Sequence, residues 1–501
     1  MTQLADAKTL VKYEMFIDGR WMSSGTGRTF DSINPYTGRA WAQFPDGSSD
    51  DVAQAVAGAR GAFEGEWGAM NGYERGRLML RLADALDADA ERIGRIETID
   101  NGKVIRETVT QARFSARSYR YFAGLADKVL GEVIPLDNRE IFDYLAREPI
   151  GVCGLILAWN SPMNLLGNKL APALAAGNTV IVKPSEHASA SVLEFAKLAE
   201  KVGFPRGVIN VVTGYGPSTG QAIVEHPDVD MISLTGGIAS GRAVGAVTAS
   251  SLKRLVLELG GKSPHIVFAD ADLKRALPGV ISGIFAAAGQ TCVAGSRLLL
   301  QSAIYDEFMD ALLERTKKIR MGDPLDPATE MGPLANLPQF ERVLGFVERG
   351  RSGGATLLTG GKRATSSELS AGFFLEPTVF ADADNSMQIA REEIFGPVLT
   401  AIKFEDEMDA VRIANDSDFG LAAGVWTSNM SRAFRMTQRL RAGTVWVNTY
   451  RTIDAAAPFG GYKNSGIGRE RGIEAMRDYT QAKNVMIDFS SGERDPFAVR
   501  T

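Results

Sequence analysis

The spacing of hydrophobic residues changes character along the chain. From Asp50 to Lys128 apolar residues recur three and four positions apart, as in Leu78, Leu82 and Leu86, which predicts amphipathic helices. The middle of the chain instead alternates helical stretches with short, almost continuous apolar runs. The predicted helices are at 164–175 and 190–202, and the apolar runs are at 150–158, 178–182, 207–213, 231–234 and 254–259. Runs of this kind predict a parallel sheet covered by helices on both faces, a doubly wound architecture.

A second alternating series begins near Gly260. Its predicted strands are at 264–268, 297–300, 398–404 and 443–448. The predicted fold class is therefore α/β, with two tandem doubly wound parallel-sheet domains. We expect a first, Rossmann-like domain from residues 1–130 and 149–258, and a second from 259–464. Ligands are expected in the cleft between them, because ligands gather at the carboxyl ends of parallel strands.

Two remaining segments, 131–148 and 480–501, form a predicted small β arm. Both contain strand-like runs without a helical partner, and the second carries Val-Met-Ile-Asp-Phe from Val485 to Phe489. An exposed edge of this composition invites aggregation unless another strand pairs with it. Pairing across subunits is the preferred explanation, so the arm is interpreted as an oligomerisation arm of a homodimer or homotetramer.

Composition narrows the classes of function. The chain has 501 residues, of which 45% are hydrophobic and 23% charged, as in folded proteins with more than one core. The formal charge is -5 and there is no basic run, so nucleic acid is not an expected partner. Met1 to Lys12 lacks the pattern of a signal peptide, and apolar runs such as 151–159 are about half as long as a bilayer span. We expect no membrane association and a cytoplasmic location.

The two cysteines have different settings. Cys153 lies inside an apolar run and is expected in the core. Cys292 ends Gly289-Gln290-Thr291-Cys292, which lies in a loop between a predicted helix and a strand. Loops on a rigid scaffold often carry catalytic residues, although a lone cysteine is more often a small buried apolar residue. The three histidines lack the spacing of metal ligands, so no metal is expected.

Two other residues make Cys292 a candidate nucleophile. Glu258 ends an apolar strand just before Gly260 and Gly261, where its carboxylate could activate water; the alternative is a salt-bridged glutamate at a strand end. Asn160 follows a strand, where its amide could stabilise an oxyanion; the alternative is a residue chosen only for the turn. Each alternative is reasonable for one residue and weak for all three together.

Seven motifs carry a resemblance to a known family. They are Trp159-Asn160-Ser161-Pro162, Lys183-Pro184-Ser185-Glu186, Leu234-Thr235-Gly236-Gly237, Glu258-Leu259-Gly260-Gly261-Lys262, Gly289-Gln290-Thr291-Cys292, Glu392-Glu393-Ile394-Phe395-Gly396-Pro397 and Pro458-Phe459-Gly460-Gly461-Tyr462-Lys463. In order and approximate spacing they resemble the aldehyde dehydrogenase superfamily, and they span most of the chain.

The resemblance implies an NAD(P)-dependent, hydrolytic, non-acylating oxidation of an aldehyde to a carboxylic acid. In this mechanism the Cys292 thiolate attacks the aldehyde carbon, and the Asn160 side chain and the Cys292 backbone N–H hold the oxyanion. Water activated by Glu258 then hydrolyses the thioester. Lys169 and Glu470 match a lysine and a glutamate that relay protons in the family; the alternative is a pair of ordinary surface charges.

The resemblance also implies how the cofactor is held, since the G-x-G-x-x-G fingerprint is absent. A helix expected near Ser240 would direct its N-terminus at a pyrophosphate. Lys183 and Glu186 match residues that hold the adenosine ribose. Glu186 would repel a 2′-phosphate and so favours NAD over NADP, although Lys183 could tolerate the phosphate. The other expected cofactor positions are Ile156, Trp159, Gly216, Thr235, Gly236, Gly237, Glu393 at the nicotinamide ribose, and Phe395, for which core packing is the alternative.

The expected substrate-binding residues are more polar than in many family members. They are Asn164, Asn168, Arg451, Ile453 and Phe459, and Ser161 replaces a common phenylalanine. We therefore hypothesise a small polar or anionic aldehyde, either a semialdehyde with a carboxylate or a substituted aromatic aldehyde. The alternative for Arg451 is an ion pair with Asp454 or with a neighbouring subunit.

Three other functions were weighed. Gly216-Pro217-Ser218-Thr219-Gly220 satisfies the G-x-S-x-G pattern of serine hydrolases, but the only later histidines, His226 and His265, do not lie late in the chain. In relatives that transfer the acyl group to coenzyme A the water-activating glutamate is typically replaced, so Glu258 favours hydrolysis. A non-enzymatic relative would not be expected to keep Asn160, Glu258 and Cys292 together.

Overall fold

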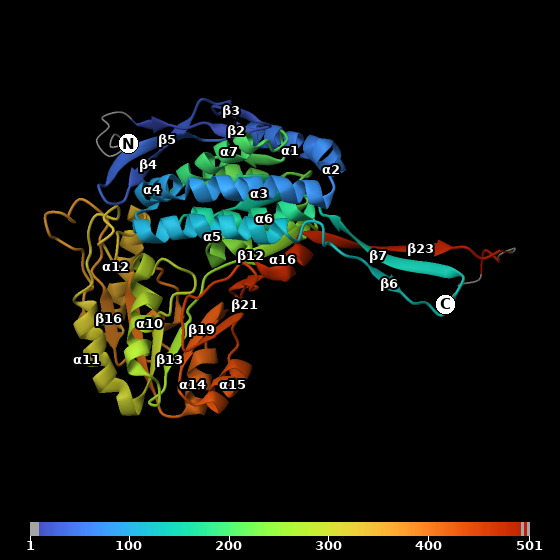
Figure 1. The fold of residues 1–501 in the computed structure, drawn as a ribbon. Coiled ribbons are helices and arrows are strands. Elements are labelled where there is room, and N and C mark those ends of the chain that lie inside the picture. Colours follow the sequence, from blue (N-terminus) through green and yellow to red (C-terminus); the bar gives the residue numbers. More distant parts are fainter. Residues whose placement is uncertain (1–9, 492–494, 498–501) are drawn as a thin grey trace.

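Two large sheets, each covered by helices, form the body of the protein. The computed structural model describes residues 10–491 and 495–497; the ends of the predicted arm at 492–494 and 498–501 lie outside them. The two sheets lie one above the other, and a β arm projects from the side (Figure 1). The predicted α/β class with parallel sheets is confirmed.

The first sheet has eight strands in the order β22-β12-β11-β8-β9-β10-β2-β3. Its five central strands are parallel and buried: β12 (Arg254–Glu258), β11 (Met231–Thr235), β8 (Val152–Ile156), β9 (Thr179–Lys183) and β10 (Ile209–Val211). The antiparallel edges are β22 (Gly466–Ile467), β2 (Met15–Ile17) and β3 (Arg20–Met22). The connecting helices are α6 (Pro162–Ala176), α7 (Ala190–Val202), α8 (Gln221–Glu225) and α9 (Ile238–Ser250). The helix expected near Ser240 therefore begins two residues earlier.

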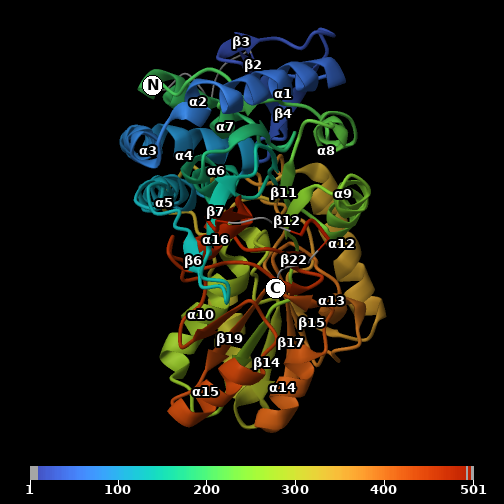
Figure 2. The same cartoon turned by 90° about the vertical axis from the view of Figure 1, so that its right-hand side faces the viewer.

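The predicted helical region packs in two places: its first long helix lies directly against β8, β9 and β10, and its last three helices form an outer layer on α6 and α7 (Figure 2). It consists of α1 (Ser49–Glu64), α2 (Glu66–Ala69), α3 (Gly72–Ala88), α4 (Ala90–Asn101) and α5 (Ile105–Ala123). Helix α1 begins where Ser48 and Asp51 form a reciprocal capping box that satisfies free backbone N–H groups. On α3 the periodic Leu78, Leu82 and Leu86 are buried, which confirms the amphipathic pattern.

The sequence analysis missed the strands that precede these helices. Besides β2 and β3, a small sheet contains β1 (Val11–Lys12), β5 (Arg39–Pro45) and β4 (Thr29–Asn34). In β4 buried and exposed side chains alternate, so a period-two signal was present in the sequence. The strands are short, and several end at glycine-containing turns that interrupt the pattern.

The second sheet has seven strands in the order β15-β16-β17-β14-β13-β19-β20. They are β15 (Thr356–Thr359), β16 (Thr378–Ala381), β17 (Val398–Phe404), β14 (Arg297–Gln301), β13 (Pro264–Val267), β19 (Ala422–Trp426) and β20 (Thr444–Val447), all parallel except β15. Its helices are α10 (Leu273–Phe285), α11 (Tyr305–Thr316), α12 (Leu337–Ser352), α13 (Gln388–Arg391), α14 (Glu407–Asn415) and α15 (Met430–Arg439). The prediction omitted β15, β16 and β19.

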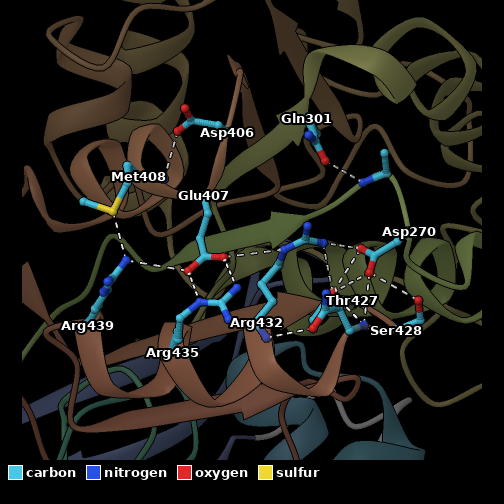
Figure 3. Close-up of polar contacts among 12 residues, drawn as sticks. Asp270, Gln301, Asp406, Glu407, Met408, Thr427, Ser428, Arg432, Arg435 and Arg439 are labelled. Carbon is cyan, nitrogen blue, oxygen red and sulfur yellow. Dashed lines mark hydrogen bonds and ion pairs between the residues drawn. The ribbon is translucent and has the colours of Figure 1, made fainter.

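Charged side chains attach α15 to the rest of the second domain (Figure 3). This helix buries only two residues, so packing alone holds it weakly. Glu407 of α14 pairs with Arg435 at 2.6 Å, and this contact keeps the pKa of Glu407 below its usual value. Asp270 pairs with Arg432 at 2.7 Å and accepts a hydrogen bond from Thr427 Oγ1. The network fixes α15 without a large apolar contact.

The arm is a three-stranded antiparallel sheet of β23 (Thr480–Asp488), β7 (Ile141–Pro149) and β6 (Glu132–Ile134). The terminal strand pairs with β7 of its own chain along its whole length, so one of its edges does not need another subunit. Pairing across subunits was the preferred explanation for this strand, and the structure instead pairs this edge within the chain. The other edge of β23 is the outer edge of the arm. Between the second domain and the arm, β22 and α16 (Gly472–Asp478) return to the first domain.

Candidate active site

Cys292 lies in a loop between the end of α10 and strand β14. The side chain of Gln290 fixes this loop: its Nε2 donates to the Ala287 carbonyl at 3.3 Å, and its Oε1 accepts from the Ala335 backbone N–H at 2.9 Å. Gly289 has a φ of +70°, and a Cβ there would lie 2.0 Å from the Gly396 carbonyl oxygen. Only glycine allows this close approach, so the thiol is carried by a constrained loop.

Asn160 reaches the same loop from the first domain. It follows β8, is 9% exposed, and donates from Nδ2 to the Gln290 carbonyl at 3.0 Å. Among the described residues nothing accepts a hydrogen bond from the Cys292 backbone N–H. One hydrogen of the amide and this N–H thus remain available as donors, as an oxyanion site requires.

Glu258 ends β12 and is 3% exposed. In the part of the chain that the structure describes, neither carboxylate oxygen has a hydrogen-bond partner. Burial, reinforced by the nearby charge of Glu470, raises the pKa of Glu258 well above its usual value. The salt-bridged alternative for this residue is therefore wrong, and a buried carboxylate without a partner suits a general base.

Lys169 and Glu470 form a buried ion pair beside this carboxylate. Lys169 Nζ lies 2.5 Å from Glu470 Oε1 and also donates to Ser233 Oγ at 3.0 Å. The two side chains are 0% and 1% exposed, so they are not ordinary surface charges. The second oxygen of Glu470 has no partner among the described residues.

Burial and the charge of Glu258 raise the pKa of Cys292 to about 12, while the charge of Arg471 acts in the opposite direction. The thiol is therefore protonated near neutral pH in the protein alone. Cys153 is fully buried in β8, as predicted for a core cysteine. Neither cysteine is in a disulfide.

Four of the five catalytic candidates, all except Lys169, line one cavity of about 110 Å³. It is lined by Lys103, Gln111, Asn160, Ser161, Asn164, Leu165, Asn168, Thr235, Glu258, Leu259, Thr291, Cys292, Val293, Trp446, Arg451, Ile453, Phe459, Glu470 and Arg471. All five predicted substrate residues are among them. Residues from both domains thus meet at the carboxyl ends of β8, β11 and β12.

The two glycines after Glu258 allow this convergence. A Cβ at Gly261 would lie 2.5 Å from the Cys292 carbonyl oxygen, and one at Gly260 would lie 2.1 Å from Glu393 Oε2. The Gly261 N–H donates to Glu393 Oε1 at 3.0 Å. The glycine pair therefore lets the backbone lie close to Cys292 and Glu393.

The predicted adenosine-ribose residues lie side by side after β9. Lys183 Nζ is 3.5 Å from Glu186 Oε2, and the Glu186 side chain remains about a quarter exposed. Ile156 ends the neighbouring strand β8, and Gly216 begins an exposed turn at 216–220 with open space at its Cβ position. Glu186 and Gly216 can therefore be reached by a ligand, whereas Lys183 is 2% exposed.

The N-terminus of α9 suits an anionic group. Thr235 ends β11, Gly236 follows, and Gly237 caps the helix without a side-chain hydrogen bond. A Cβ at Gly237 would meet nothing within 4 Å. The first N–H groups of the helix and its dipole are thus accessible for a pyrophosphate.

The two residues expected near the nicotinamide, Glu393 and Phe395, lie just before β17. Phe395 contacts Trp159 edge-on with ring centroids 5.2 Å apart. It is half-buried with a φ of +58°. Burial raises the pKa of Glu393 to about 7. Together, the predicted cofactor residues fit a dinucleotide. The N–H groups of α9 can bind phosphate, the carboxylates can accept hydrogen bonds from ribose hydroxyls, and the aromatic rings lie near the thiol.

The predicted substrate residues have different partners from those expected. Arg451 lies 3.7 Å from Glu107 and donates to the Ser282 carbonyl at 3.1 Å, whereas Asp454 pairs with Arg117. The alternative pairing of Arg451 with Asp454 is therefore wrong. Two other predicted substrate residues are Asn164 and Asn168. Asn164 Oδ1 has no hydrogen-bond partner among the described residues, and Asn168 Oδ1 accepts a hydrogen bond from Arg471 Nε. Ile453 is exposed, while Phe459 packs near Cys292.

Two cationic residues of the cavity were missed by the sequence analysis. Lys103 lies in the turn before α5 and carries no local sign of a site. Arg471 directly follows Glu470, so its proximity to the site could have been inferred from that neighbour. Both are buried and both line the cavity.

The structure does not support the hydrolase alternative. Ser218 lies in an exposed turn, and its hydroxyl contacts only the Tyr215 carbonyl among the described residues. His265 is buried between Tyr450 and Trp426 in the second domain. In the part of the chain described, no group of three His, Cys, Asp or Glu side chains is arranged like metal ligands. None of the helices described there combines the length and apolar character of a bilayer crossing.

Comparison with known proteins agrees with the chemistry that the arrangement of the site indicates. The model of the aldehyde dehydrogenase family matches residues 21–485. One relative is (Z)-2-((N-methylformamido)methylene)-5-hydroxybutyrolactone dehydrogenase of Acinetobacter baylyi. It is 45% identical to this chain over 98% of this chain and 100% of its own length. Betaine aldehyde dehydrogenase of Bacillus subtilis is 43% identical over 94% of this chain and 96% of its own.

A solved structure extends the likeness to the fold. Betaine aldehyde dehydrogenase from Staphylococcus aureus, crystallised with NAD⁺, is 38% identical with a TM-score of 0.96, covering 98% of this chain and 97% of that one. Fold and site define an α/β oxidoreductase with two large sheets and a thiol in the cavity between them. The chain belongs to the aldehyde dehydrogenase family and is an NAD(P)-dependent aldehyde dehydrogenase.

Proposed function

We propose that the enzyme oxidises a small polar aldehyde to its carboxylic acid through a thioester on Cys292, with NAD as the preferred cofactor. One observation carries the mechanism: the thiol, the Asn160 amide and the unpartnered carboxylate of Glu258 line a single cavity. A nucleophile, an oxyanion donor and a base in one small space are the three groups that acyl chemistry through a thiol needs.

Each residue has one part in the sequence of bonds. The Cys292 sulfur forms a bond to the aldehyde carbon and gives up its proton, which the buried carboxylate of Glu258 accepts. Asn160 and the Cys292 backbone N–H hold the oxygen of the thiohemiacetal as it becomes negative. A nicotinamide cofactor held by Glu393 and the N-terminus of α9 would supply the hydride acceptor for this carbon.

Release of the acid uses the same carboxylate. Glu258 takes a proton from water as the hydroxide oxygen bonds to the acyl carbon, and the carbon–sulfur bond then breaks to release the Cys292 thiolate, which takes its proton back from Glu258. The raised pKa of Glu258 makes it a stronger base than an exposed carboxylate. Lys169 and Glu470, paired and buried behind it, offer a route for the proton to leave the cavity.

The preference for NAD rests on Glu186. Its carboxylate is accessible beside Lys183, where it can accept hydrogen bonds from two ribose hydroxyls and repel a phosphate on one of them. We expect Glu186→Gln to raise the affinity for NADP relative to NAD, measured by fluorescence titration. An unchanged ratio of the two affinities contradicts this assignment.

Several polar groups in the cavity support a polar or anionic aldehyde. Lys103, Asn164, Arg451 and Arg471 all line it. The relative from Acinetobacter baylyi is named for a 5-hydroxybutyrolactone. Such a ring is in equilibrium with an open-chain aldehyde that carries a carboxylate, which agrees with the same class of substrate for this enzyme.

The arm supports a homo-oligomer. It projects from the body (Figure 1), the outer edge of β23 has no strand beside it in the described structure, and Met486 and Ile487 are half-exposed or more. A second copy of the chain can cover this edge. Light scattering should give a dimer or tetramer, and a monomer at micromolar concentration contradicts the proposal.

Substitution of the nucleophile tests the proposal directly. Cys292→Ala should abolish NADH formation from any aldehyde while NAD binding persists. Cys153→Ala is the matched control, because that thiol is buried in β8 away from the cavity, and it should retain activity. Turnover at the wild-type rate by Cys292→Ala is incompatible with the mechanism.

A further inference from the structure

Arg471 is a buried cation at the centre of the molecule. It precedes α16, is 5% exposed, and lines the cavity that contains Cys292. Its backbone has a φ of +60°, a conformation that is unfavourable for a residue with a side chain. A strained backbone and a buried charge both cost stability, so the position requires an explanation.

The surrounding residues hold the guanidinium group in one orientation. Its central carbon lies 5.2 Å from the ring centroid of Phe114 and 5.0 Å from that of Phe459. Its Nε donates to Asn168 Oδ1 at 2.9 Å. Contacts with aromatic rings and one hydrogen bond at Nε leave the two terminal nitrogens for another partner.

No carboxylate in the described part of the chain forms an ion pair with these nitrogens. The adjacent Glu470 is already paired with Lys169. Arg451 differs, because Glu107 lies 3.7 Å from it. Lys103 also lacks an acidic partner, but its ammonium donates to Ser161 Oγ at 2.5 Å and to Gln111.

We propose that Arg471 binds the carboxylate of a short aldehyde that carries its negative charge at the end opposite the carbonyl group. This inference rests on the proposed function and names the substrate class of the same site. The two terminal nitrogens match the two oxygens of a carboxylate, and such a pair is strong where water is excluded. Phe459 contacts both the arginine and the region of Cys292, so the charged end and the reacting end lie in one cavity.

The size of the cavity sets the length of this substrate. At about 110 Å³ it is smaller than the sites of typical drug-sized ligands, so the aldehyde has only a few carbon atoms between its two ends. Asn164 Oδ1, which has no partner among the described residues, can accept a hydrogen bond from a substrate hydroxyl.

The test compares two probes, 4-oxobutanoate and its uncharged methyl ester, with NAD in excess. The wild-type enzyme should prefer the carboxylate in kcat/KM. Arg471→Gln should lower kcat/KM for 4-oxobutanoate by about 10²-fold, mainly through KM, and change the ester by less than about threefold. Arg471→Lys keeps the charge without the fork and should recover part of the preference. Arg477→Gln, on the exposed face of α16, is the matched control and should alter neither probe.

Other results would overturn the inference. Equal losses for both probes assign Arg471 to the fold or to the ionisation of Cys292, and the rate of Cys292 alkylation at pH 8 separates these two. A wild-type enzyme that oxidises the ester as well as the carboxylate removes the carboxylate site but leaves the proposed function intact. An enzyme that forms NADH from neither probe and from no other aldehyde contradicts the proposed function itself.

Discussion

The pKa of Cys292 gives a quantitative prediction for the enzyme without cofactor. Burial and the charge of Glu258 raise it to about 12, so only about one thiol in 10⁴ is ionised at pH 8, compared with about a quarter for an ordinary cysteine. Because only the thiolate reacts, the rate of alkylation by iodoacetamide should increase about tenfold for each pH unit from 7 to 9.5. Mass spectrometry of the Cys292 peptide measures this rate.

The shape of the pH profile decides the outcome. An increase without a plateau agrees with a protonated thiol in the resting enzyme. A plateau at or below pH 9 refutes the reasoning, because it means that the thiol ionises like an exposed cysteine. Cys153 provides an internal control, since it is fully buried and should stay unmodified throughout.

Two further substitutions test the geometry around the thiol. Asn160→Ala should reduce kcat by about 10²- to 10³-fold while the affinity for NAD is unchanged, and stopped-flow absorbance with a titration of NAD checks both; a loss below threefold removes its role in holding the oxyanion. Gly261→Ala places a methyl group 2.5 Å from the Cys292 carbonyl oxygen, so we expect kcat to fall by about 10²-fold or more, in a steady-state assay, with the unfolding temperature only slightly lower. Activity close to that of the wild type in Gly261→Ala means that the loop can shift without cost.

Hydrophobic spacing was sufficient to predict the two-sheet architecture. The central strands of a parallel sheet are buried on both faces, so β8, β9 and β11 read as continuous apolar runs. The amphipathic helices could be predicted because each buries only one face, which spaces its apolar residues three and four positions apart. The N-terminal strands were missed because most of them are short, so the apolar run is brief and broken by turns.

The site was predicted only as far as it follows the strand ends. Asn160, Glu258 and Thr235 each come directly after or at the end of a parallel strand, and the carboxyl ends of such strands meet in one cleft. Lys103 comes from a turn and Arg471 from the start of a helix. No periodic pattern in the sequence relates such positions to a distant loop. Their approach to Cys292 depends on the packing of α5 and α16 against α6, which sequence alone does not reveal.

The ion-pair partner of a charged residue could not be predicted from the sequence either. An ion pair of Arg451 with Asp454 was one alternative to substrate binding, yet Arg451 approaches Glu107 of α5 and Asp454 pairs with Arg117 of the same helix. Both contacts cross between distant segments. Ion pairs of this kind are set by how helices pack, not by sequence separation.

The hydrolytic role of Glu258 is tested most directly by rapid mixing of Glu258→Gln with aldehyde and NAD, followed by intact-protein mass spectrometry. The account predicts a first burst of about one NADH for each active site, then a steady rate at least about 10²-fold below that of the wild type, with the acyl group attached to Cys292. Steady turnover at the wild-type rate, or an acyl group on any other residue, would contradict it.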